Sequence, residues 1–105
     1  MNEAESGPPA SYQVHASGQV RAAILALGKQ AASLGIGSEF TRALDRIYER
    51  LATDPWSLGE LIRPASIPGS ALHVGSERPL TIRFLIDEER RIVFLLQLFF
   101  YPSSL

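Results

Sequence analysis

The first half of the chain repeats its apolar residues at the spacing of a helix. One series recurs at intervals of three and four residues: Val20, Ile24, Leu27, Ala31 and Leu34. A second series follows: Phe40, Leu44, Ile47 and Leu51. Such spacing gathers apolar side chains on one stripe of a helix. The pattern predicts helices over about 18–34 and 38–53, capped by Ser17 and Ser38 and joined as a hairpin.

The second half changes from helical spacing to alternation. Leu80, Ile82, Phe84 and Ile86 alternate with Thr81, Arg83 and Leu85, which is typical of a strand with one buried face. After a charged loop over 87–91, residues 92–101 are almost continuously apolar. This run predicts a central strand buried on both faces and paired antiparallel with 80–86. Shorter strands are expected over 12–15, 60–63 and 71–74, with turns over 75–77 and 68–70.

Composition narrows the class of protein. The chain has 105 residues, 46% of them hydrophobic, no cysteine and a formal net charge of -1. We therefore expect one domain over 12–105 after a flexible tail over 1–11, and a cytoplasmic protein with no signal peptide and no membrane contact. The expected fold class is α+β, with an N-terminal strand and helical hairpin packed on a C-terminal antiparallel sheet.

The expected core does not accommodate all of the apolar side chains of the last strand. Seven residues are expected to be nearly fully buried: Ile24, Leu27, Leu44, Ile47, Leu51, Phe84 and Phe94. Two short helices cannot cover both alternating sets of the last strand, so one set should meet a partner. The expected partner-binding residues are Leu85, Leu96, Leu98, Phe99, Phe100 and Tyr101. Alternatively, the N-terminal tail or the segment 56–71 covers this surface.

Candidate chemistry is sparse. There is no phosphate-binding glycine loop, no nucleophile elbow and no metal-ligand spacing, so we expect no metal and no cofactor. The catalytic candidates are Arg63, Arg83, His73 and Tyr101, all on or beside the predicted sheet. A guanidinium on an open sheet face suits a phosphate backbone. The competing interpretation is that Arg83 pairs with Glu60 or Glu77 on a neighbouring strand and that His73 is an ordinary strand histidine.

Two stretches of the sequence resemble the RelE/ParE superfamily of bacterial toxins. Residues 43–55, with their Asp-Pro exit, resemble the second helix of that family, and residues 78–96 resemble its long hairpin. Residues 12–27 match its opening strand and first helix. The resemblance implies a toxin of a toxin–antitoxin system. Its partner would be a small antitoxin-like protein or a second copy of the chain. The family includes ribosome-dependent mRNA endonucleases and gyrase inhibitors.

The residues that the nuclease branch uses are replaced here. The resemblance implies basic or acid–base groups at positions held by Thr81, Leu72, Val74 and Tyr101. Our leading hypothesis is therefore a toxin-fold protein that acts by binding or has lost its activity, and the enzyme assignment leans toward no. Two alternatives stay open: an mRNA endonuclease in contact with nucleic acid or the ribosome, and a stand-alone homodimeric interaction protein.

Overall fold

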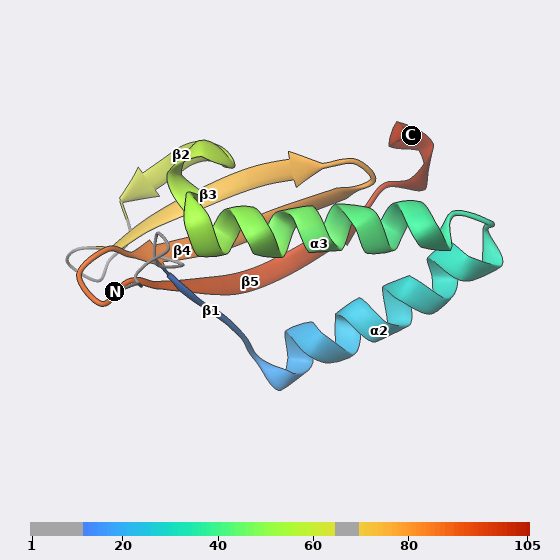
Figure 1. Cartoon of the computed structure of the whole chain (residues 1–105), viewed down its shortest axis with the longest axis horizontal. Helices are drawn as coiled ribbons and strands as arrows, with labels where there is room; N and C mark the ends of the chain where they lie inside the picture. The colour runs from blue at the N-terminus through green and yellow to red at the C-terminus, as the bar shows by residue number, and fades with distance from the viewer. Residues whose placement is uncertain (1–11, 65–69) are drawn as a thin grey trace, which may run out of the picture.

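The structure is a computed structural model that describes residues 12–64 and 70–105. The chain forms β1 (Gln13–Ala16), α2 (Gly18–Ser33), α3 (Gly37–Thr53), the short 3-10 helix η1 (Pro55–Ser57), β2 (Gly59–Pro64), β3 (Ser70–Glu77), β4 (Leu80–Asp87), β5 (Ile92–Phe100) and the 3-10 helix η2 (Pro102–Ser104). This order confirms the predicted α+β class, and both helices begin and end within a residue of the predicted bounds (Figure 1). The predicted tail over 1–11 and most of the turn over 68–70 lie outside the described residues.

The two helices begin differently. Ser17 caps α2, since its Oγ accepts a hydrogen bond from the N–H of Val20 at 3.1 Å. Ser38 does not cap α3. That helix begins one residue earlier, after Ile36, and has no side-chain cap. The φ of +80° at Gly35, between the helices, is a left-handed conformation that glycine adopts without a steric penalty. This glycine lets the hairpin turn within three residues.

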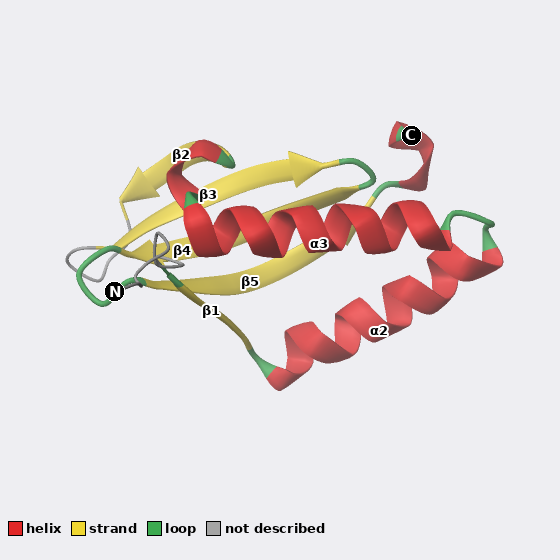
Figure 2. Cartoon of the chain, viewed as in Figure 1, coloured by secondary structure: helices red, strands yellow, loops and turns green. Residues whose placement is uncertain are grey.

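The sheet has five strands in the order β1-β5-β4-β3-β2. Three of its pairs are antiparallel, but β1 runs parallel to β5, with Gln13 beside Ile92 and Ala16 beside Leu95. The C-terminal strands β2 to β5 form the predicted antiparallel sheet, and the parallel N-terminal strand β1 makes the whole sheet mixed. Figure 2 shows the helices gathered on one side of the strands.

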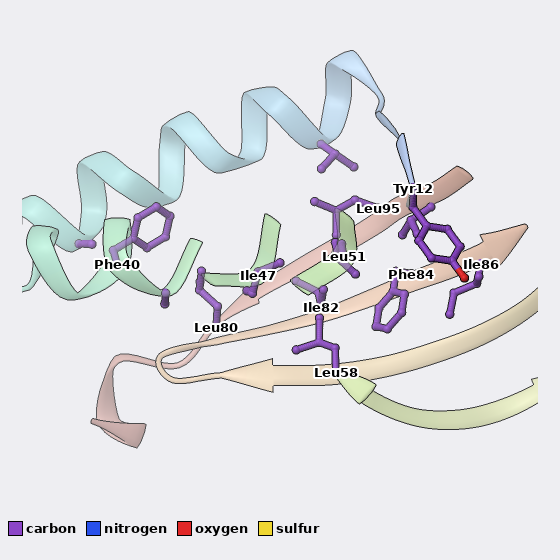
Figure 3. Close-up of a cluster of buried hydrophobic side chains, with 14 residues drawn as sticks. Tyr12, Phe40, Ile47, Leu51, Leu58, Leu80, Ile82, Phe84, Ile86 and Leu95 are labelled. Carbon is purple, nitrogen blue, oxygen red and sulfur yellow. The ribbon is translucent and has the colours of Figure 1, made fainter. Parts of the chain in front are cut away.

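The core lies between α3 and the sheet. Ile47 and Leu51 of α3 and Phe84 of β4 are fully buried, as predicted, and Figure 3 shows their side chains between helix and strands. Ile24, Leu27 and Leu44 are only half-buried. The reason is that α3 lies over the sheet, roughly along its strands, whereas α2 lies at its β5 side, where only Val20 and Ala31 of that helix become buried (Figure 1).

The β3–β4 hairpin is longer than predicted. The expected turn over 75–77 belongs to β3, and the chain turns at Arg78–Pro79 instead. Glu77 faces the helices, where its carboxylate accepts from Arg46 and Arg50 at 3.1 and 3.0 Å. Glu77, which the local sequence pattern places in a turn, thus lies in β3 and forms ion pairs with α3.

No helix in the described part of the chain is long and apolar enough to cross a membrane.

Candidate interaction surface

The side of the sheet opposite the helices, here named the outer face, is apolar across its centre. The strand register places Phe94, Leu85 and Leu72 in one row across β5, β4 and β3. All three are half-buried, because only neighbours on the same face shield them. His15 of β1 extends the row, with its ring edge-on to Phe94 at a centroid distance of 5.8 Å. No described helix packs on this face (Figure 1).

This finding corrects two predictions. We expected β5 to be buried on both faces and Phe94 to lie in the core. Instead, β5 buries only its helix-side residues, Val93 and Leu95, and Phe94 lies on the outer face opposite Leu85. An aromatic strand was expected to need cover on both faces, but only one layer of helices is present in the described residues.

A bulge in β5 divides the predicted partner-binding residues between the two faces. Phe84 pairs with Leu95 and Arg83 with Gln97, which leaves Leu96 as an extra residue. An extra residue reverses the alternation beyond it. Leu98 and Phe100 therefore turn toward the helices and pack against the core, and Phe100 meets Phe40 edge-on at a centroid distance of 5.7 Å. Leu85 and Phe99 remain on the outer face, and Leu96 is exposed.

Arg83 lies on the outer face, as the alternation predicted, but has a different neighbour. Its Nη1 donates to Oε1 of Gln97 on β5 at 3.0 Å. The suggested partner Glu77 is on the helix side with Arg46 and Arg50. The other suggested partner, Glu60, is two strands away, about 10 Å across the sheet. The guanidinium is thus held by an uncharged amide.

The remaining catalytic candidates do not meet Arg83 at one place. His73 faces the helices, buried between Trp56 and Phe84, with its ring stacked on Phe84 at a centroid distance of 5.3 Å. Tyr101 follows β5 and is exposed, with its ring stacked on Phe99 at 6.5 Å. Arg63 lies on β2, where its backbone pairs opposite Leu72. The predicted four-residue set is therefore divided between the two sides of the sheet.

A polar cluster at one end of the sheet was not predicted. Glu88, in the β4–β5 loop, accepts hydrogen bonds at Oε1 from the Tyr12 hydroxyl at 2.6 Å and from Trp56 Nε1 at 2.7 Å. At Oε2 it accepts from Arg91 at 2.9 Å. The Arg91 guanidinium also lies 4.7 Å from the centroid of the Tyr12 ring. The members come from three distant segments, so no local sequence signal could have joined them.

The cluster perturbs two of its members in opposite directions. Hydrogen bonds from Tyr12 and then Trp56 stabilise the carboxylate and hold the pKa of Glu88 below its ordinary value. Burial, followed by the bond to Glu88, raises the pKa of Tyr12. The cluster joins Tyr12, just before β1, to η1 and the β4–β5 loop. Its three donors all donate to the Glu88 carboxylate, which is typical of a structural contact.

The cluster also bears on what covers the outer face. Trp56 sits edge-on to His73, on the helix side, and Leu58 is buried in the core. Trp56 and Leu58 therefore do not cover the outer face, although our alternative interpretation assigned this cover to the segment 56–71. The loop over 65–69 lies outside the described residues. Within the described ranges, no group of three or more His, Asp or Glu residues could hold a metal ion.

Comparison with known proteins identifies the fold. No family model matches the sequence, and no curated protein matches it. Among solved structures, a chain of the archaeal RelE–RelB complex from Pyrococcus horikoshii OT3 matches with a TM-score of 0.63 at 14% sequence identity. The match covers 90% of this chain and 99% of that one. The arrangement of helices and strands described above is therefore a RelE-like fold.

Proposed function

We propose that this chain is the toxin-fold member of a toxin–antitoxin pair and that it acts by binding a partner, not by cleaving RNA. The observation that carries the proposal is the apolar row of Phe94, Leu85 and Leu72 on the outer face, which no described helix covers. Apolar surface of this kind is characteristic of interaction sites. The similar fold in a RelE–RelB complex supports a partner of the antitoxin class.

The distribution of side chains favours binding over catalysis. A nuclease built from the candidate residues would need an acid–base pair beside a group that stabilises negative charge. Arg83 is on the outer face and His73 is buried on the other side. Around Arg83 the outer face presents Val74, Thr81 and Leu85, none of which transfers protons near neutral pH. Such a surface is suited to recognition by packing.

Expression in a bacterial host tests the proposal. We expect induced expression to arrest growth and co-expression of the product of an adjacent short gene to restore it, with the two proteins purifying together. The Leu85→Asp variant places a charge on the outer face and should weaken co-purification by at least about tenfold, because burying an unpaired carboxylate is costly. The matched control Leu25→Asp, on the exposed side of α2, should purify with the partner as the wild type does.

Other outcomes would change the conclusion. Growth unaffected by expression would remove the toxin assignment. Equal loss of binding in both variants would show that the outer face is not the interface. A stable dimer of the isolated chain, dissociated by Leu85→Asp, would instead support the homodimeric interaction protein.

A further inference from the structure

The β1 side of the sheet is only partly occupied. β1 pairs with β5 from Ile92 to Leu95 and stops at Ala16, after which the chain leaves for α2. β5 continues to Phe100 and stays paired with β4 on its other side. Over residues 96–100, β5 has no neighbouring strand on the β1 side within the described residues. This stretch is here named the open edge.

The backbone at the open edge has donors and acceptors that point away from the sheet. The N–H of Tyr101 donates to the carbonyl of Pro79 at 2.8 Å, so Tyr101 directs its N–H toward the β4 side. Successive residues of a strand direct their backbone polar groups to opposite sides. Leu98 and Phe100 therefore direct theirs to the open edge. None of the hydrogen bonds found among described residues outside the strand ladders involves these groups.

A hollow of about 300 Å³ lies beside the open edge, between β5 and the first turns of α2. It is lined by the apolar residues Val20, Ala23 and Leu98 and by the uncharged polar residues Ser17, Gln19 and Gln97. No lining residue is charged. A strand added at the open edge would point alternate side chains into this hollow and the others toward Phe99 on the outer face.

We propose that the open edge binds an extended, uncharged segment of a partner protein, which adds to the sheet as a sixth strand in line with β1. The backbone groups of Leu98 and Phe100 that point to the open edge supply the main-chain hydrogen bonds, and the hollow accepts an apolar side chain. This is the way in which peptides bind exposed sheet edges. The lack of charge in the lining excludes a charged side chain there, because it would lose its hydration without a counterion.

The length of the open edge argues against a second copy as the occupant. The stretch is bounded by the end of β1 on one side and by Pro102, which cannot donate, on the other. A second copy would have to bring its own β1 and α2 to the same short stretch, whereas a free segment enters and leaves at any angle. The inference relies on the proposed function only for the natural source of the segment, so the two fail separately.

The experiment uses the full chain labelled with ¹⁵N and the probe peptide acetyl-Thr-Val-Thr-Val-Thr-amide. In the free monomer, the amides of Leu98 and Phe100 should exchange with solvent at least about 100-fold faster than that of Phe99, which faces β4. Titration with millimolar peptide should shift the Leu98 and Phe100 signals saturably and slow their exchange. A peptide methylated on alternate nitrogens should bind at least about tenfold more weakly, because it lacks the matching donors.

A matched pair of variants separates binding from folding. Ala23→Phe fills the hollow and should weaken the peptide by at least about tenfold. Ala22→Phe, one residue earlier on the exposed side of α2, should leave binding unchanged. The proposal is overturned if the amides of Leu98 and Phe100 exchange as slowly as that of Phe99 in the free monomer, or if they become slow only when the chain forms a dimer. It is also overturned if the peptide shifts no signals, or shifts only signals of residues away from the open edge. Growth arrest without peptide binding would leave the proposed function intact and overturn the proposed peptide site at the open edge.

Discussion

Replacement of Ile47 by alanine gives the sharpest test of how the helices pack. Ile47 is fully buried on the face of α3 that meets the sheet, near Leu80 and Ile82 in Figure 3. Removal of three buried carbon atoms costs about 2.4 kcal/mol of transfer free energy. The cavity left behind raises the cost to about 3–4 kcal/mol. A domain of this size is stable by about 5–15 kcal/mol, so the variant should lose much of its stability.

Urea denaturation followed by far-ultraviolet circular dichroism measures this loss. The midpoint should fall while the slope m stays constant, since the same surface is exposed on unfolding. The matched control is Leu25→Ala on α2, where the side chain is 70% exposed. That variant should change the free energy of unfolding by less than about 0.5 kcal/mol. A loss below about 1 kcal/mol for Ile47→Ala, or equal losses in the two variants, would refute the assignment of the buried face of α3.

Three further predictions concern the backbone, the acid range and RNA. Gly59→Ala should lower the free energy of unfolding by more than about 2 kcal/mol in a urea melt, because its Cβ would lie 1.9 Å from the carbonyl oxygen of Val74. Gly18→Ala, whose Cβ meets nothing within 4 Å, should be neutral or stabilising; equal effects would contradict the close approach of β2 and β3. Because the folded-state pKa of Glu88 is depressed, its contribution to stability is complete above the unfolded value of about 4.3 and is lost as the pH falls through the lower folded value. Glu88→Gln should therefore lose stability at pH 7 and show a smaller further loss on acidification, whereas parallel pH profiles in thermal melts would exclude the carboxylate as the cause. Finally, translating ribosomes treated with the purified protein should show no codon-dependent cuts by primer extension; cuts that disappear with Arg83→Ala would establish the nuclease alternative.

The sequence by itself determined the two helices and the buried face of β4. The stripe through Phe40, Ile47 and Leu51 predicted α3 because a helix gathers residues three and four apart, and these residues are buried. The alternation through Leu80, Ile82 and Phe84 predicted which side of β4 meets the helices. Both signals are local, since each depends only on the geometry of a single helix or strand.

Only the tertiary structure decided which side chains and backbone groups of these elements lie on each surface of the protein. The bulge at Leu96 arises from the pairing of β5 with β4 and moves Leu98 and Phe100 to the helix side. The cluster around Glu88 joins segments 76 residues apart. The open edge exists because β1 is shorter than β5 and runs parallel to it. Register and strand order depend on contacts between residues that are distant in the chain, and no spacing within a single segment records them.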